Sequence, residues 1–287
     1  MTLYVVFADQ KYVTTTPILT LKVLHDKIPS SLQFVCEHLT RSQCVTVDHH
    51  SITGDILLGC DDGVEIYSRD SGEVRHVSDH VRVRVVDYKG EVFISHHDDN
   101  NTVFKVIKYD TVQKKSESLF SFPLSFMKSS RLSVSDHFVA AIDKQNNTIK
   151  LYDRQAGHRA GSNTLTTLTL PEYQGIFNIR LLTDDTLLVT GWDTARANTY
   201  KLDKYRFSRD RLHLIWSYRD VPDLPAGIAV DDRGRIYVSG FKTRTIYVLS
   251  DEGEIVLIFI SIQWLDRTCI LIKFLRNDQR LLFAPSY

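Results

Sequence analysis

Four short apolar runs follow one another in the segment Pro225–Phe259, PAGIAVDDRGRIYVSGFKTRTIYVLSDEGEIVLIF. β-branched and aromatic residues dominate the runs GIAV, RIYVS, TIYVLS and EIVLIF, as they do in β-strands. Gly and Asp between the runs supply the positive φ angles and local hydrogen bonds of tight turns. Runs of this length are too short for helices, and turns of this length allow only antiparallel pairing. The segment therefore predicts a four-stranded antiparallel meander.

Segments like the second run of this meander recur along the whole chain. Their first apolar residues are Ile56, Val92, Phe138, Leu187, Ile236 and Leu281. Most of the spacings lie in the forties, and a period of this size with four strands per unit is typical of β-propeller blades. The sequence therefore predicts an all-β fold, a six-bladed β-propeller of four-stranded antiparallel blades.

The two ends of the chain bear on how the ring closes. After the last repeat only two strands remain for the sixth blade, at about 268–274 and 280–286, while Leu3–Ala8 and Val13–Val23 are strand-like and precede the first blade. We expect N- and C-terminal strands to share this blade, because the ring then leaves no open sheet edge. The alternative is that residues 1–44 form a separate extension.

Composition supports a single β-propeller domain over residues 1–287. No linker or change in composition divides the 287 residues, and propellers of this length form one domain. Within it, residues 1–44 would provide the N-terminal strands and a connection, and residues 45–287 the blades. Residues 31–40 also fit helical spacing, which leaves the structure of that connection open.

Charge and cysteine usage narrow the expected surroundings of the protein. The 35 basic and 35 acidic residues cancel, which gives no argument from net charge for a nucleic-acid or membrane partner. The N-terminus has no secretory signal pattern, and the most apolar run, Ile255–Ile262, is far too short to span a bilayer. Four cysteines without regular spacing fit reduced thiols. We expect a cytoplasmic protein without a membrane segment.

The segment Pro225–Gly253 resembles an NHL repeat. The residues that match its pattern are Pro225, Gly227–Asp231, Gly234, Ile236–Ser239, Ile246–Val248, Asp251 and Gly253. The other repeats match in period and strand order, and in this they resemble the degenerate blades of animal tripartite-motif (TRIM-NHL) proteins. The resemblance implies a propeller that binds protein or RNA, while an N-terminal RING, B-box and coiled coil supply ubiquitin ligase activity and oligomerisation. This sequence lacks the paired Cys and His residues that a RING or B-box needs for zinc, so it resembles the propeller part alone.

The sequence gives little support for catalysis. Calcium-dependent lactonases resemble this chain in their strand pattern but place an acidic ligand in a Pro-Asp-Gly turn. Here Ala226 stands in that turn, and alanine offers no oxygen to a hard cation. No G-x-S-x-G motif or P-loop is present, and the cluster Cys36, His38 and Cys44 lacks zinc-binding spacing. We therefore expect no enzyme, no catalytic residue, no metal and no cofactor.

A partner would contact the loops that join the second and third strands of the blades, which share one face with the inter-blade connections. The predicted partner-binding residues are His96, His97, Trp192, Arg196, Phe241, Lys242 and Arg244. Aromatic side chains beside cations are typical of protein hot spots, and they also suit stacking on unpaired RNA bases. A third alternative is that the aromatic side chains only pack against a neighbouring blade.

These residues lead to three alternatives for function. The predicted function is a non-enzymatic platform that binds protein through this loop face, with substrate recognition in a ubiquitin-ligase context as its role. Binding of single-stranded RNA by the same face is the alternative. A calcium-dependent, lactonase-like hydrolase is the second alternative.

Overall fold

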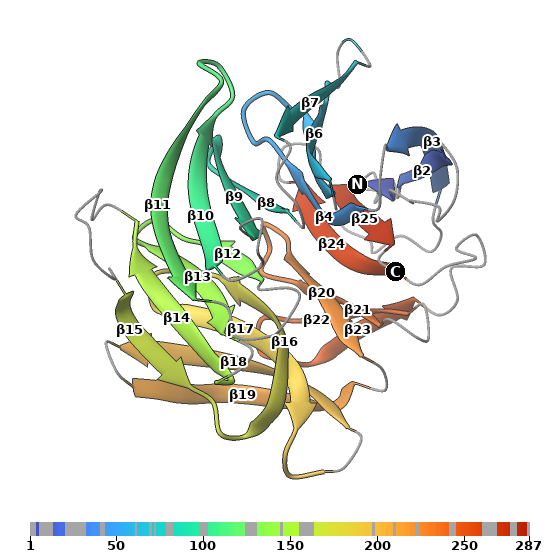
Figure 1. Cartoon of the computed structure of the whole chain (residues 1–287). Helices are drawn as coiled ribbons and strands as arrows, with labels where there is room; N and C mark the ends of the chain where they lie inside the picture. The colour runs from blue at the N-terminus through green and yellow to red at the C-terminus, as the bar shows by residue number, and fades with distance from the viewer. Residues whose placement is uncertain are drawn as a thin grey trace.

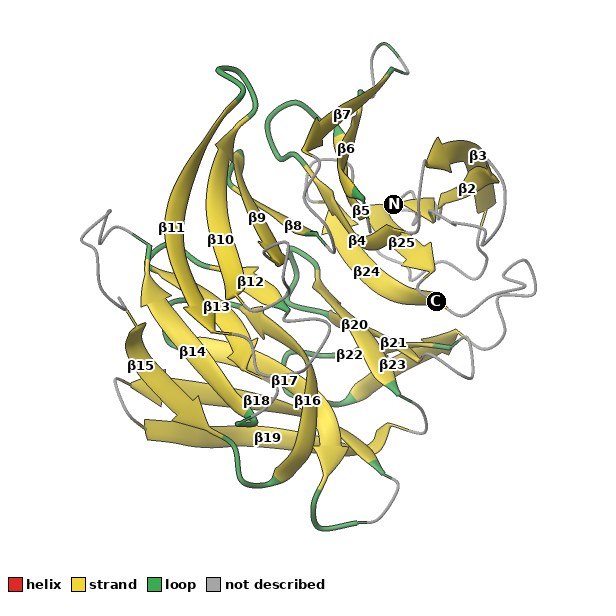
Figure 2. Cartoon of the chain, viewed as in Figure 1, coloured by secondary structure: helices red, strands yellow, loops and turns green. Residues whose placement is uncertain are grey.

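A computed structural model provides the structure of the chain. It describes residues 4–5, 14–20, 33–40, 44–60, 62–68, 71, 73–78, 83–97, 103–123, 131–143, 146–154, 164–196, 199–208, 211–221, 224–240, 245–259, 269–275 and 280–285. These residues form β-strands and turns (Figure 2), and the described part of the chain holds no helix that would cross a membrane.

Five four-stranded antiparallel sheets, here called blades one to five, make up most of the fold (Figure 1). Each is a simple meander, with its strands paired in chain order. Blade one is β4 (Cys44–His49), β5 (Ile56–Cys60), β6 (Gly63–Tyr67) and β7 (Val74–Ser78); blade two is β8 (Arg84–Tyr88), β9 (Glu91–His97), β10 (Val103–Asp110) and β11 (Lys115–Pro123); blade three is β12 (Leu132–Val134), β13 (Phe138–Asp143), β14 (Thr148–Asp153) and β15 (Thr164–Thr169); blade four is β16 (Tyr173–Leu181), β17 (Thr186–Asp193), β18 (Tyr200–Ser208) and β19 (Arg211–Val221); and blade five is β20 (Pro225–Val230), β21 (Ile236–Gly240), β22 (Ile246–Leu249) and β23 (Ile255–Phe259). The fold is therefore an all-β propeller of four-stranded antiparallel blades.

The prediction of six four-stranded blades is not confirmed, since the described residues form five. The ends of the chain build a three-stranded sheet, in which β24 (Cys269–Leu275) pairs with β25 (Arg280–Pro285) and β25 pairs in parallel with β1 (Tyr4–Val5). Strands β2 (Thr14–Thr20) and β3 (Gln33–Thr40) pair with each other as a separate two-stranded sheet. N- and C-terminal strands thus share a sheet, but β2 takes β3 as its partner and does not add a fourth strand.

The first strand of each blade faces the centre of the ring. Strands β4, β8, β12, β16, β20 and β24 each contact the next, and β24 contacts β4 again. The three-stranded sheet therefore occupies the place between blade five and blade one. The helical alternative for residues 31–40 is wrong, because strand β3 spans most of them.

The hydrophobic core lies between the blades. Separate clusters of buried apolar side chains fill the interfaces of blades one and two, two and three, three and four, and four and five. Representative members are, in that order, Leu57 and Ile94, Phe93 and Tyr152, Leu151 and Leu187, and Leu188 and Tyr247. Blades two, three and four are therefore buried on both faces, and the stability of each blade depends on its neighbours.

Side chains connect the inner strands where no backbone ladder can. The Thr46 hydroxyl accepts a hydrogen bond from the Val85 N–H at 3.0 Å, and the Ser133 hydroxyl accepts one from the Leu181 N–H at 2.8 Å. These bonds join blade one to blade two and blade three to blade four. They satisfy buried backbone donors that face the neighbouring blade.

The sequence repeat placed the second strands correctly. Strands β5, β13 and β21 begin at the predicted first apolar residues, and the predicted positions in β9, β17 and β25 lie one residue inside those strands. The four-stranded meander of the segment 225–259 is confirmed as blade five. Gly234 and Gly253 adopt the positive φ angles, +79° and +87°, that their turns require.

We predict that Ser133→Ala destabilises the propeller by about 1–3 kcal/mol, because the buried Leu181 N–H loses its acceptor and cannot reach water. The free energy of unfolding in urea would measure this loss. Ser208→Ala, at an exposed serine of β18, is the matched control and should change stability by no more than about 0.5 kcal/mol. Equal effects of the two substitutions would contradict a stabilising role for the Ser133 bond.

Candidate functional site

The structure describes four of the seven predicted partner-binding residues. Trp192 at the end of β17 is 41% exposed, and Arg196 is exposed in the turn that follows. His96 and His97 end strand β9, but they are only 5% and 4% exposed. Their buried side chains offer no surface to a partner, so they are not part of the candidate site. The remaining three, Phe241, Lys242 and Arg244, lie outside the described residues.

Trp192 belongs to a cluster of three aromatic side chains on blade four. Its ring lies edge-on to Phe177, with centroids 5.2 Å apart and planes at 75°. It stacks with Tyr200 at 6.3 Å and 26°. Gly175 lies beneath the Trp192 ring, where a Cβ atom would come within 3.5 Å of it. The indole is therefore held in one position while a large part of it faces solvent.

Polar contacts fix the turn beside this cluster. The Thr194 N–H donates to the Glu172 carbonyl at 3.1 Å, which joins the β17–β18 turn to the connection between blades three and four. The buried Asp193 carboxylate accepts from the Arg219 guanidinium at 2.8 Å and from the Ala195 N–H at 3.0 Å. The turn that carries Arg196 therefore starts from a fixed backbone.

A buried charged cluster lies under the same turn. Lys201 and Asp203 are 1% and 0% exposed and form an ion pair at 2.9 Å. The hydroxyls of Tyr173 and Tyr205 donate to the same Asp203 oxygen at 2.7 and 2.8 Å. The Lys201 ammonium also lies 4.0 Å from the centroid of the Tyr173 ring. Charges buried this deeply need such partners, and breaking the set by removing one member is costly.

Burial raises the pKa of Tyr173 well above its ordinary value, and the nearby Asp203 carboxylate adds to this shift. Burial likewise raises the pKa of Tyr205. Both hydroxyls therefore stay protonated and act as hydrogen-bond donors at neutral pH. The Tyr173 ring in turn packs over Gly191, the residue before Trp192, so the cluster supports the exposed indole from below.

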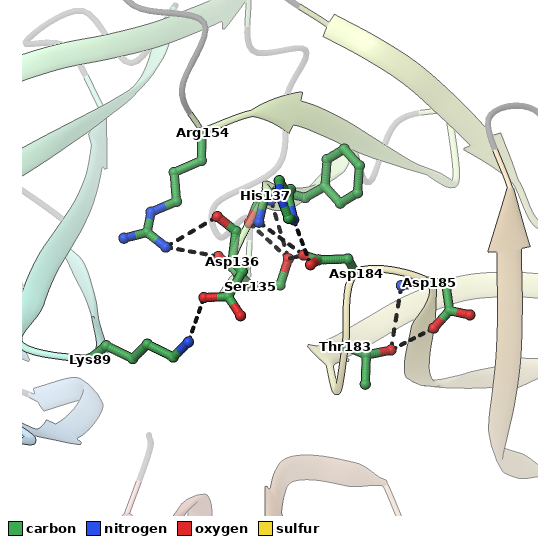
Figure 3. A network of polar contacts seen from close by, with 9 residues as sticks. Lys89, Ser135, Asp136, His137, Arg154, Thr183, Asp184 and Asp185 are labelled. Atoms are coloured by element: carbon green, nitrogen blue, oxygen red, sulfur yellow. Dashed lines mark hydrogen bonds and ion pairs between the residues drawn. The ribbon is translucent and has the colours of Figure 1, made fainter.

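A second polar network joins blades two, three and four at the other ends of their strands (Figure 3). Lys89 donates to Asp136 at 2.5 Å, and His137 Nδ1 lies 2.6 Å from Asp184 Oδ2. Arg154 donates to the carbonyls of Ser135 and Asp136 at 3.1 and 3.3 Å. Consecutive turns of a meander lie at opposite ends of its strands, so this network is remote from Trp192.

The Ser135, His137 and Asp184 side chains do not form a catalytic triad. In a triad the histidine bridges the serine and the carboxylate. Here the Ser135 hydroxyl donates to Asp184 Oδ1 at 2.7 Å, and the carboxylate is the bridge. The arrangement ties a turn of blade three to a turn of blade four. Among the described residues, no group of three or more His, Cys, Asp and Glu side chains is placed to hold a metal ion.

Both clusters escaped the sequence analysis, although signals for them exist. Lys201, Asp203 and Tyr205 alternate along β18 and therefore lie on one face of the sheet. His137 and the neighbouring Asp136 lie in the turn between β12 and β13. The 49-residue spacing between blades three and four brings Asp184 beside His137.

We predict that His137 makes stability depend on pH. The hydrogen bond to Asp184 raises the pKa of His137 in the folded state. The protonated pair therefore stabilises the fold fully below about pH 6.5, the ordinary histidine pKa, and this contribution is lost as the pH rises through the raised value. Between pH 5.5 and 8.5, the thermal midpoint of the wild type should fall by more than that of His137→Gln, which cannot titrate, so the two midpoints should converge. Parallel curves for the two proteins would contradict the prediction.

We also predict that alanine substitutions at two glycines beside the aromatic cluster differ in their effect on stability. A Cβ atom at Gly191 would come within 2.5 Å of the Tyr173 ring and overlap the Gly175 carbonyl, so Gly191→Ala should cost about 1–3 kcal/mol and alter the Trp192 fluorescence. Gly175→Ala meets only an ordinary contact with Trp192 and is the control, with little loss. Urea unfolding and emission spectra would test both. A Gly191→Ala protein as stable as Gly175→Ala would contradict the packing described.

Comparison with known proteins supports the fold and leaves the family open. No protein-family model matches the sequence, and no curated protein matches it. Among solved structures, a chain in the crystal structure of a mitotic checkpoint complex is similar, with a TM-score of 0.52 over 85% of this chain and 91% of that chain. The two share 13% sequence identity. At this identity the likeness concerns the fold alone, a β-propeller.

Proposed function

We propose that this chain is a non-enzymatic platform that binds a protein partner through the Trp192 surface. This surface comprises Trp192, Phe177, Tyr200 and Arg196. The observation that carries the proposal is an indole that is 41% exposed and yet held by two aromatic neighbours on a fixed turn. A large apolar side chain exposed on a rigid support is unfavourable in water until a partner covers it.

The chemistry of this surface favours a protein. Tryptophan, tyrosine and arginine are the residues enriched in the energetic centres of protein interfaces. A surface that is already ordered loses little conformational entropy on binding. The comparison adds modest support, since a propeller of the same fold is part of a protein complex.

The NHL-like pattern of blade five gives the proposal a finer form. The match over Pro225–Gly253 supports a relationship to the propellers of TRIM-NHL proteins. On that basis, we propose a single propeller domain over residues 1–287 that recognises a substrate in a ubiquitin-ligase context in the cytoplasm. Phe241, Lys242 and Arg244 would extend the Trp192 surface onto blade five.

Single-stranded RNA is the second candidate ligand. It is favoured by Arg196, which is exposed in the turn after β17, three residues beyond Asp193 and close in sequence to Trp192. A base could stack on the indole while the guanidinium contacts a phosphate. Such binding would weaken steeply with salt, because phosphate contacts release counterions. A protein interface centred on Trp192 depends on apolar burial and responds less to salt.

We predict that Trp192→Ala weakens binding of the protein partner by about 30-fold or more, the loss expected for a hot spot of about 2 kcal/mol. Partners would be captured with the purified wild-type chain, identified, and their affinities measured with each variant. Val112→Ala is the matched control, because Val112 is an 88% exposed apolar residue on a distant hairpin turn. Equal affinity of Trp192→Ala and wild type for every captured partner would contradict the proposal.

A parallel measurement addresses RNA. Fluorescence anisotropy with a labelled single-stranded RNA pool, at low and high salt, should show no saturable binding. Saturable binding that falls with salt and is lost in Arg196→Ala would favour the RNA alternative over the protein. Thermal midpoints of all variants would confirm that each is folded.

A further inference from the structure

Blades four and five meet along an outer seam that is held by tryptophan packing and an ion pair. The Trp216 indole packs over Gly253 in the β22–β23 turn, and its N–H donates to the Asp251 carbonyl at 2.8 Å. The Lys204 ammonium donates to the Asp251 carboxylate at 2.6 Å. The outermost strand of blade four and the last turn of blade five therefore form one continuous, rigid surface.

Exposed apolar side chains occur on both strands that border this seam. Of the eight large apolar residues that are exposed within the described part of the chain, four lie on β19 and β23. These are Leu214 (44% exposed), Ile215 (45%), Ile255 (43%) and Val256 (46%). Ile255 pairs with Leu249, which packs between blades four and five, so the Ile255 side chain lies on the Trp216 side of its sheet. Leu214 pairs with Tyr205, which packs between blades three and four, so the Leu214 side chain lies on the opposite face of blade four and outside the seam. Ile215 of β19 and Ile255 of β23, one exposed apolar residue from each side of the seam, are here called the apolar strip.

Charges of opposite sign lie on the two blades that form the seam. Arg211 and His213 precede the apolar residues on β19 and are exposed, and Arg206 lies opposite His213 on β18 with 67% of its side chain exposed. On the other side, Glu252 and Glu254 are exposed in the β22–β23 turn. Arg206 forms a long ion pair with Asp185, in which Nε and Oδ2 are 3.7 Å apart. The order across the seam is therefore basic on blade four and acidic on blade five.

This order is self-complementary. In an interface with two-fold symmetry, each patch meets the same patch in reverse, so the basic side of one copy faces the acidic side of the other and the exposed apolar side chains are buried between the copies. A partner with charge of a single sign would be attracted by one side of the seam and repelled by the other. The charges therefore favour a second copy of the chain as the occupant.

Strand addition is a poorer fit to the same surface. Strand β19 has an irregular register where Ile215 lies between the paired residues Leu214 and Trp216. Strand β23 has a similar irregularity where Val256 lies between Ile255 and Leu257. Such bulges interrupt the ladder edge that an added strand would need. A partner would therefore contact this surface through side chains and not by adding a strand.

We propose that the chain forms a two-fold symmetric dimer through the outer seam of blades four and five, defined by Arg206, Arg211, His213, Ile215, Ile255, Glu252 and Glu254. The Trp192 cluster has no part in this interface. The inference therefore stands independently of the proposed function.

A charge exchange tests the symmetry directly. Sedimentation velocity of the full chain up to about 100 µM should show a dimer. Arg206→Glu with Arg211→Glu makes both sides acidic, and Glu252→Arg with Glu254→Arg makes both sides basic, so each double variant alone should be monomeric. An equimolar mixture of the two should again form a dimer, because each acidic side then faces a basic one. Wild-type chain that remains monomeric up to this concentration would overturn the proposal.

An apolar substitution tests the centre of the strip. Ile255→Asp should abolish the dimer, whereas Val112→Asp, at an exposed valine of a distant turn, should leave it unchanged. A dimer that survives in both charge variants, or one that is lost equally in Val112→Asp, would place the interface elsewhere and overturn the proposal. Thermal midpoints close to wild type would show that each variant is folded.

Discussion

The innermost strand of every blade has a backbone ladder on one side only, and the rest of the structure depends on how its other edge is satisfied. The hydroxyls of Thr46 and Ser133 accept hydrogen bonds from backbone amides of the next blade. The Asp48 carboxylate does the same for the Asp87 N–H at 3.0 Å. Buried amides leave water only when they find acceptors. Short polar side chains at these positions therefore help to join blade one to blade two and blade three to blade four.

This requirement explains why small residues occur among the large ones. A Cβ atom at Gly59 would come within 2.8 Å of the Val83 carbonyl, so blades one and two could not approach as closely with a larger residue there. A Cβ atom at Gly191 would likewise collide with the Tyr173 ring in blade four. Close approach lets the side-chain bonds form and buries the apolar clusters between blades. Packing and hydrogen bonding are thus two consequences of the same spacing.

The parts of the fold that the sequence predicted are those that repeat locally. Second strands begin with a β-branched or aromatic run after a turn, and this pattern placed β5, β13 and β21 at their first residues. The sixth four-stranded blade is not confirmed, and no local pattern reveals that β2 pairs with β3. In the site, the exposure of Trp192 followed from its place at a turn. The burial of His96 and His97 did not, since both extend strand β9 beyond the expected turn.

The buried charges of blade four act on the candidate binding surface through a series of contacts. Lys201 and Asp203 would destabilise a typical core, yet here they hold Tyr173, which supports Gly191 and hence the Trp192 indole. On the other face of the blade, Lys204 and Trp216 fix the seam to blade five. A blade fixed on both faces cannot rearrange to hide its exposed apolar side chains. Such side chains remain in water until another surface covers them, which is the physical basis for our proposal that this propeller meets its partners through blade four.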